Sequence, residues 1–326
     1  DACNLRCTTC WFYGTNGILN DPEALKKSRH EELNTGEFKR IIREAAPYRP
    51  LIIFSGGDPL VRKDIVELVR FTSSLGMFTS INCNGTLLRD EMIDGLIEAG
   101  LTSITVSIDG AEKAHEDIRG KGSFKLTVDA IERVLRKRGH RSLPLVNIIC
   151  TVTNQNAGEL DQLKEVAREL GVDNLRIQQQ WFVNEQIYQA HREVMKRDFG
   201  NESTYLEGFI TDNAETIDVQ LLTDQIKLLN GIKVQFYPDL TSNELKQFYS
   251  RSTEPVRKKC YAPWLALNVK PNGEATTCPA IDYRAGNLKY QSLMEVWNSE
   301  AQRKMRCRVS EKGLMPGCIR CCGLFS

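Results

Sequence analysis

The stretch Asp1-Ala2-Cys3-Asn4-Leu5-Arg6-Cys7-Thr8-Thr9-Cys10 places three cysteines at the spacing C-x3-C-x2-C. Three thiolates on one short loop can hold three corners of a [4Fe–4S] cluster and leave the fourth iron without a protein ligand. A small molecule can bind and be activated at that open iron. A zinc site is the alternative, although structural zinc uses a closed set of four ligands, usually in closely spaced pairs. The triad has no fourth ligand nearby in the sequence, so its spacing favours an iron–sulfur cluster.

The eleven cysteines of the chain are strongly clustered. Three lie in residues 1–10 and six in residues 260–322, which leaves only Cys83 and Cys150 between them. Disulfides are rare in cytosolic proteins, so this distribution indicates two metal sites at opposite ends of the sequence. We interpret Cys83 and Cys150 as packing cysteines, with donation of a hydrogen atom as the alternative.

The composition is that of an ordinary globular protein. Of the 326 residues 41% are hydrophobic, enough for one large core or for one large and one small domain. Lys plus Arg number 43 against 42 acidic residues, and no block of charge indicates a nucleic-acid or membrane-surface partner. There is no apolar run of about 18 residues and no signal-peptide pattern, so we expect a cytoplasmic location. Because the chain opens almost on Cys3, we also expect a strand before Asp1.

Residues 36 to 180 alternate between strand-like and helical stretches. Strands are expected at residues 50–54, 78–82, 103–108, 145–152 and 175–178, and helices at residues 37–46, 65–75, 90–99, 124–137 and 159–170. Strands that alternate with helices of this length form βαβ units and a parallel sheet. Together with the strand expected before Cys3 they make about six units. The pattern predicts an α/β fold, a partial (β/α)6 TIM-like barrel over residues 1–182.

The active site of such a barrel lies on the loops that follow the strands. Three of these loops carry polar and glycine residues, namely Ser55-Gly56-Gly57-Asp58-Pro59, Asn82-Cys83-Asn84-Gly85 and Ser107-Ile108-Asp109-Gly110. Each is also an ordinary turn composition, since Gly, Asn, Asp and Pro punctuate most loops. Because all three loops would lie on the same face as the three-cysteine loop, we interpret them together as one binding site.

The remaining chain divides into a connector and a small C-terminal unit. Residues 183–259 are expected to form a helical insertion with helices at 184–196 and 217–229 and one extra strand at 233–237. Residues 260–326 are expected to form a β-hairpin, with strands at 264–269 and 274–277 around an Asn-Gly turn, followed by a helix at 292–306.

Cysteines frame this hairpin and recur at the end of the chain. Cys260 precedes the hairpin, Cys278 closes it, and Cys318 and Cys321 form a C-x2-C pair. Four thiolates are a full set for one closed iron–sulfur cluster, and a zinc ribbon is the alternative. Cys307 and Cys322 exceed the four ligands, and the sequence leaves them unassigned.

The N-terminal motifs resemble those of the radical S-adenosylmethionine (radical SAM) superfamily, and the resemblance covers nearly the whole chain. Cys3, Cys7 and Cys10 look like its cluster-binding motif. The Gly-Gly-Asp loop resembles its "GGE" motif, with Asp58 one methylene shorter than the usual Glu. Thr9 stands where the family usually has an aromatic residue, and Trp11 is the expected substitute. Residues 260–321 resemble a SPASM or "twitch" subdomain that lacks a further C-x5-C-x3-C, which implies a single auxiliary [4Fe–4S] cluster.

The resemblance also implies the cofactor and its contacts. In the family the open iron is chelated by the methionine half of S-adenosylmethionine (SAM), and one electron breaks the C5′–S bond to give a 5′-deoxyadenosyl radical. A reduced flavodoxin or ferredoxin would be the electron donor. The residues expected to contact SAM are Gly56, Gly57 and Asp58 at the ammonium, Asn82, Ser107 and Asp109 at the ribose or carboxylate, and Arg119 at the carboxylate.

The expected activity is abstraction of a hydrogen atom from a substrate, assisted by the auxiliary cluster. A peptide or protein substrate, and so a maturase, is the first expectation. Oxidation of a small polar molecule such as an amino-sugar or cyclitol is the alternative, and a non-catalytic electron-transfer protein is a remote one. The sequence names no acid or base that acts on the substrate.

Overall fold

The computed structural model describes residues 2–14, 17–19, 32–201, 205–211, 216–250, 253–257 and 259–321. The chain divides into two compact units. The first unit comprises Asp1–Thr8, Asn34–Gln178 and Gln220–Phe236, and the second comprises Thr9–Leu33, Gln179–Val219 and Tyr237–Ser326. Among the described residues no helix combines the length and hydrophobicity that a bilayer span requires.

The first unit is built on one sheet of six strands in the order β1-β2-β3-β4-β5-β6. The strands are β1 (Ile52–Phe54), β2 (Thr79–Cys83), β3 (Ser103–Ser107), β4 (Leu145–Val152), β5 (Asn174–Gln179) and β6 (Val234–Tyr237). Strands β1 to β4 pair in parallel, with Ile52 opposite Thr79 and Ser80 opposite Ser103. Their carboxyl ends therefore meet at one edge of the sheet, as the barrel prediction requires.

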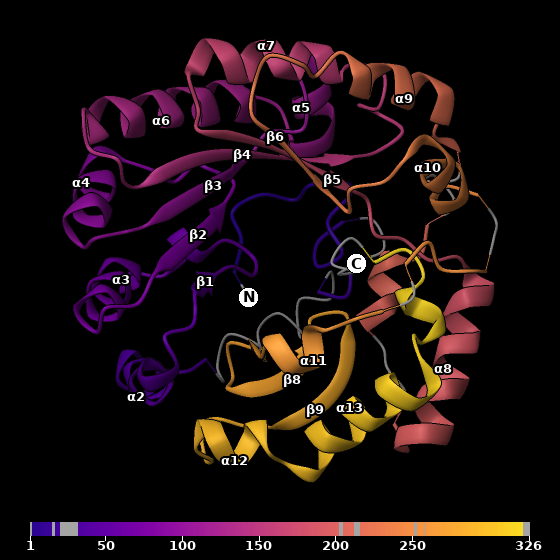
Figure 1. Ribbon diagram of the computed structural model, residues 1–326. Coiled ribbons are helices and arrows are strands. Elements are labelled where there is room, and N and C mark those ends of the chain that lie inside the picture. The colour runs from indigo at the N-terminus through magenta and orange to yellow at the C-terminus, as the bar shows by residue number, and fades with distance from the viewer. Residues whose placement is uncertain are drawn as a thin grey trace. The chain divides into compact units, whose positions relative to one another are not determined.

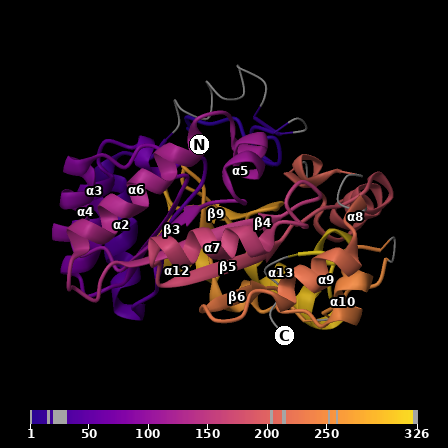
Figure 2. The ribbon, with the colours of Figure 1, turned by 90° about the horizontal axis from the view of Figure 1, so that it is seen from above.

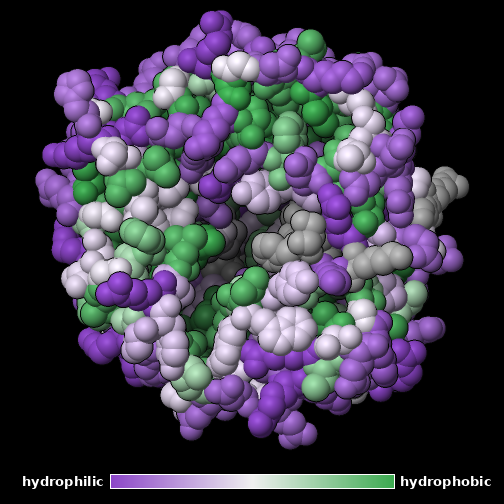
Figure 3. All heavy atoms as spheres, viewed as in Figure 1, coloured by the Kyte–Doolittle hydropathy of each residue, from purple (hydrophilic) through white to green (hydrophobic). Residues whose placement is uncertain are grey.

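Helices cover the outer side of this sheet (Figure 1). They are α2 (Thr35–Ala45), α3 (Ile65–Ser74), α4 (Asp90–Glu98), α5 (Glu112–Arg119), α6 (Ser123–Arg138), α7 (Leu160–Leu170) and α9 (Val219–Lys227), with short 3-10 turns η1 (Ala46–Tyr48) and η2 (Pro59–Val61). Each buries one face, and Ile42, Leu68 and Met77 pack together between α2, α3 and the sheet. The outward faces stay polar, so the surface over α6 and α7 is mostly hydrophilic (Figure 3).

The sequence located most of these elements to within two residues, and the structure adds two differences. The expected extra strand at 233–237 is β6, which belongs to the sheet as its sixth strand rather than to a separate connector. Helix α5 was not expected, because five of its eight residues are charged and only Ala114, His115 and Ile118 are buried. Figure 2 shows α5 and the N-terminal segment at the same end of the first unit, where the Thr8 amide donates to the Ile118 carbonyl at 2.9 Å.

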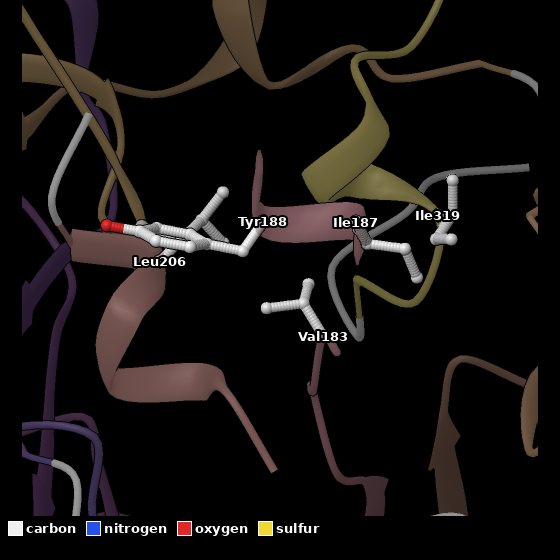
Figure 4. Packing of buried hydrophobic residues seen from close by; sticks show 6 residues of the cluster. Val183, Ile187, Tyr188, Leu206 and Ile319 are labelled. Carbon is white, nitrogen blue, oxygen red and sulfur yellow. The ribbon is translucent and has the colours of Figure 1, made fainter. Parts of the chain in front are cut away.

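The second unit combines helices with a small antiparallel sheet. Among its described residues the helices are α8 (Glu185–Phe199), η3 (Tyr205–Phe209), α10 (Ser242–Phe248), α11 (Ala262–Leu265), α12 (Leu293–Trp297), α13 (Glu300–Lys312) and η5 (Pro316–Cys318), and the strands are β7 (Asn268–Val269), β8 (Glu274–Cys278) and β9 (Ile281–Asn287). A buried cluster joins η3, α8 and the residue after η5 through Val183, Ile187, Tyr188, Leu206 and Ile319 (Figure 4).

Three expectations for this unit were wrong in detail. Trp264 and Leu265, expected to begin a strand, belong to helix α11, because Pro263 occupies the first turn of this helix, where its missing N–H costs nothing. A third strand, β9, pairs with β8. The helix expected at 292–306 is two helices, since the Ser299 side chain caps a new helix by accepting from the Gln302 amide at 3.1 Å.

Candidate functional site

Asp58 ties together three segments at the carboxyl edge of the sheet. Its amide donates to the Ala2 carbonyl at 2.7 Å, and its carboxylate accepts from the amides of Leu60 at 2.9 Å and Asn84 at 2.8 Å. The side chain is buried, and burial raises its pKa although the two amide donors oppose this. Asp58 therefore holds the Gly-Gly-Asp loop against the cysteine loop and the loop after β2.

Nitrogen donors of Leu5 and Asn84 reach the first cysteine. The Cys3 thiol lies 3.5 Å from the Leu5 amide nitrogen and 3.9 Å from the Asn84 side-chain nitrogen. The same Asn84 nitrogen donates to the Asn4 side-chain oxygen at 2.9 Å. N–H groups that point at sulfur suit a thiolate, the form in which cysteine binds a metal.

The second cysteine faces a guanidinium. Arg119, at the end of α5, places its Nη1 atom 3.9 Å from the Cys7 sulfur and its Nε atom 2.6 Å from the Asp109 carboxylate. Burial alone would lower the pKa of Arg119, but the charges of Asp109 and Cys7 outweigh burial and raise it. The guanidinium stays positive beside Cys7 and favours the thiolate there.

Asp109 connects the ends of β3 and β4 with α5. It is 1% exposed, and its second carboxylate oxygen accepts from the Thr151 amide at 3.0 Å. Its carbonyl accepts from the Asn156 side chain at 2.8 Å, and its amide lies 3.3 Å from Nδ1 of His115. Both carboxylate oxygens are therefore engaged within the protein.

The other residues expected at the cofactor lie at the ends of neighbouring strands. Asn82 on β2 and Ser107 on β3 are half-buried. Gly56 is exposed with φ +131°, a conformation that L-residues rarely adopt, and a Cβ built there would meet no atom within 4 Å. The backbone conformation, not a lack of space, therefore requires glycine at position 56. With Gly57 beside it, this part of the loop carries no side chains. The contacts of these residues with SAM stay predictions.

Asn84 is the residue that sequence reasoning missed. The expectation singled out Asn82 in the same loop, but Asn84 is the one that is buried and that bonds to both Asp58 and Asn4. The signal was available in the dipeptide Asn84-Gly85, because Gly85 adopts φ +82°. An Asn-Gly dipeptide after a strand marks a tight turn.

Cys10 belongs to the second unit, where the aromatic residues that follow it pack together. Trp11 stacks on Phe209 with ring centroids 5.0 Å apart and an interplanar angle of 22°, and it lies 3.7 Å from the Phe12 ring. The aromatic side chain expected to cover the cluster in place of Thr9 thus packs on η3.

The C-terminal cysteines gather within the second unit. Burial, reinforced by the neighbouring Cys260, raises the pKa of the Cys278 thiol to about 11, and burial with the neighbouring Cys278 raises that of Cys318 to about 12. The Cys321 amide donates to the Cys318 carbonyl at 3.1 Å, which closes the C-x2-C turn. Cys307 is exposed on α13, and Cys322 lies outside the described residues.

The donor sets fit iron–sulfur clusters. In the described part of the chain no three Cys, His, Asp or Glu side chains surround a single point as one metal ion requires. Cluster ligands need not do so, because each cysteine binds a different iron of the cube. The N–H donors at Cys3 and Cys7 match sulfur ligands that carry negative charge.

Two family models match the sequence. The model of the radical SAM superfamily matches residues 1–167, and an iron–sulfur cluster-binding domain model, SPASM, matches residues 260–322. Both matched regions contain the cysteines discussed above.

Relatives match over nearly the full chain. The AdoMet-dependent heme synthase of Methanosarcina barkeri is 30% identical over 96% of this chain and 84% of its own length. The PqqA peptide cyclase of Bradyrhizobium diazoefficiens is 31% identical over 93% of this chain and 72% of its own. Among solved structures, native anSMEcpe with bound AdoMet has a TM-score of 0.63 at 16% identity and covers 93% of this chain and 79% of its own, so it shares the fold. By its sequence, the chain belongs to the radical SAM superfamily, with SAM and iron–sulfur clusters as its cofactors.

Proposed function

We propose that this protein cleaves SAM reductively and uses the resulting 5′-deoxyadenosyl radical to abstract a hydrogen atom from a peptide or protein substrate. One observation carries the first half of the proposal. Cys3 and Cys7 each face a side-chain N–H donor that is itself held by a buried aspartate network at the carboxyl edge of the sheet.

The protein's part in this reaction is to bind and to orient. Cys3, Cys7 and Cys10 are proposed to hold the N-terminal cluster, which supplies one electron when bound and reduced. Asp58 and Asp109 fix the loops around these cysteines, since each joins at least two chain segments by hydrogen bonds. The bare backbone at Gly56 and Gly57 leaves room for the SAM ammonium, and Arg119 provides a positive charge for its carboxylate.

The second cluster is proposed for the C-terminal unit. Cys260, Cys278, Cys318 and Cys321 are its proposed ligands, because Cys260 lies close enough to Cys278, and both lie close enough to Cys318, to raise the pKa of the neighbouring thiol. Burial raises the pKa values of Cys260, Cys278 and Cys318, so metal binding by these thiols displaces protons. A cluster there would accept an electron from the product radical.

A peptide substrate is supported by the similarity to a peptide cyclase over 93% of this chain. A second candidate is an iron porphyrin, because the similarity to a heme synthase extends over 96% of the chain. Neither relative supports the amino-sugar or cyclitol alternative.

The enzyme class is tested by the formation of 5′-deoxyadenosine. The anaerobically reconstituted, reduced protein should convert SAM to 5′-deoxyadenosine and methionine. Cys7→Ala should abolish this conversion, whereas Cys307→Ala, a cysteine exposed on α13, should leave it unchanged. Wild-type protein with a full iron content that forms no 5′-deoxyadenosine would refute the proposal.

The substrate class is tested by the transfer of deuterium. Extracts of the source cells grown in heavy water are incubated with the enzyme and unlabelled SAM, and deuterium in 5′-deoxyadenosine is measured by mass spectrometry. If the substrate is a peptide, protease treatment of the extract should remove the transfer and extraction of porphyrins should not. The reverse pattern would overturn the peptide assignment in favour of the porphyrin.

A further inference from the structure

Asn84 uses each of its polar groups within the first unit. Its side-chain oxygen accepts from the amide of Thr86 at 2.9 Å and from the Thr86 hydroxyl at 2.6 Å. Its side-chain nitrogen donates one hydrogen to Asn4 at 2.9 Å and directs the other to the Cys3 sulfur at 3.9 Å. Because both acceptor bonds fix the oxygen, the nitrogen is the atom that must point at Cys3.

The backbone of Asn84 is held as firmly as its side chain. Its amide donates to Asp58 at 2.8 Å, and its carbonyl accepts from the Thr127 hydroxyl on α6 at 2.9 Å. The next residue, Gly85, lies against Val106 so closely that an added Cβ would be 2.8 Å from the valine Cγ1. A loop packed in this way cannot move its amide group without breaking several buried contacts.

A donor directed at a cluster sulfur has a defined electronic consequence. Reduction adds negative charge to the cluster, and an N–H bond to a ligating sulfur stabilises the more negative state. Hydrogen bonds to the sulfurs therefore raise the reduction potential. The same bonds fix the direction of the ligating side chain.

We infer that Asn84 is a positioning residue that orients Cys3 and raises the reduction potential of the N-terminal cluster through its side-chain N–H. It acts through Cys3 and links this ligand to Asp58 in the Gly-Gly-Asp loop. The inference rests on the proposed function in one respect, namely that Cys3 ligates the cluster.

Two substitutions separate this role from a general role in folding. Asn84→Asp keeps an acceptor for Thr86 but replaces the N–H donor with negative charge, and Asn84→Ala removes the donor without adding charge. The measurement is a redox titration of the full-length, reconstituted protein followed by electron paramagnetic resonance. The signal of the N-terminal cluster is the one that changes when SAM is added.

We expect the potential to fall in the order wild type, Asn84→Ala, Asn84→Asp. The control is Asn147→Asp, which replaces another buried asparagine whose side chain donates to Ser103 within the sheet, and it should leave the potential unchanged. If both Asn84 variants had the same reduction potential as the wild type, the inference would be overturned. A reduced iron content would not rescue it, because a merely structural role lowers the occupancy of the cluster site without shifting the potential.

A milder variant covers the case in which both Asn84 substitutions prevent folding. Thr86→Val removes the hydroxyl that donates to the Asn84 oxygen, and it should lower the potential by a smaller amount; an unchanged value would overturn the inference.

Cys3→Ala distinguishes the role of Asn84 from the proposed function. If Cys3→Ala keeps the SAM-sensitive signal, the ligand assignment fails; if it loses the signal while the Asn84 and Thr86 variants behave as wild type, only the role of Asn84 fails.

Discussion

The Asp109–Arg119 pair offers a direct test of how the cysteine loop is held. The two side chains lie 2.6 Å apart, and they are only 2% and 15% exposed. Asp109 also accepts from the Thr151 amide, so the carboxylate joins α5 to the end of β4. Asp109→Asn preserves the size of the side chain and an acceptor for Thr151, but it removes the charge that faces Arg119.

The magnitude follows from burial. Opposite charges about 4 Å apart attract by about 4 kcal/mol at the effective dielectric constant of about 20 that suits such sites. Removal of one partner of a buried pair costs about 3–5 kcal/mol, because the remaining charge stays buried without compensation. We expect Asp109→Asn to lower the free energy of unfolding by about 3 kcal/mol. The double variant Asp109→Asn/Arg119→Met should cost about 2 kcal/mol less than the sum of the two single variants.

The assay is urea denaturation of the cluster-free protein, followed by circular dichroism under reducing conditions. The matched control is Asp129→Asn, which breaks an exposed pair with Lys125 on α6 whose side chains are 39% and 76% exposed. Solvent screens such exposed pairs, so they contribute little to stability. If Asp109→Asn cost no more than Asp129→Asn, or if the two variants at the buried pair were additive, the pair would not hold α5 in place.

Three further predictions concern a glycine, a buried histidine and the thiols. Gly85→Ala should destabilise the protein by about 1–3 kcal/mol more than Gly171→Ala in the same urea assay. Both glycines have positive φ, but only at Gly85 would the added Cβ lie within 3 Å of a side chain; equal losses of stability would contradict this. Burial lowers the pKa of His115 to about 4, so its neutral form stabilises the fold above about pH 6.5 and this contribution is lost as pH falls toward 4, with a slope of up to about 1.4 kcal/mol per pH unit. His115→Gln should reduce that slope, and an identical profile would argue against a buried neutral histidine. In the cluster-free protein at pH 8 a maleimide should modify the exposed Cys307 well before Cys318, whose pKa burial raises to about 12, and mass spectrometry that found the opposite order would contradict this arrangement.

The sequence was sufficient to predict the barrel because the hydrophobic periodicity of its strands and helices agrees with the positions of the glycines that end the helices. Several βα units combine an apolar strand, a helix of about ten residues and a glycine at the helix end, such as Gly171 after α7, which adopts φ +68°. The C-terminal unit was harder to predict. Its strands are short, and Pro263, in the first turn of α11, directly precedes the stretch expected as a strand at 264–269. Local preference decides such short elements less than tertiary pairing does.

In the candidate site, too, local sequence patterns were predictable and contacts between distant segments were not. Cysteine spacing and the Gly-Gly-Asp loop are local patterns, so the sequence could place them. The partners of these residues are set by which loops meet at the carboxyl edge of the sheet, and they are up to 112 residues apart, as for Cys7 and Arg119. Sequence alone assigned Asp58, Asp109 and Arg119 to the cofactor.

In the structure, Asp58, Asp109 and Arg119 are already bonded to other groups of the protein. Both carboxylates accept two hydrogen bonds from the chain, and Arg119 is shared between Asp109 and Cys7. Groups that are already bonded can meet a cofactor without reorganising, which is the physical meaning of a preorganised site. Loss of Asp58 or Asp109 should therefore disturb the cysteine loop even before SAM binds. It follows that iron content and redox potential, measured without SAM, report on these aspartates more directly than turnover does.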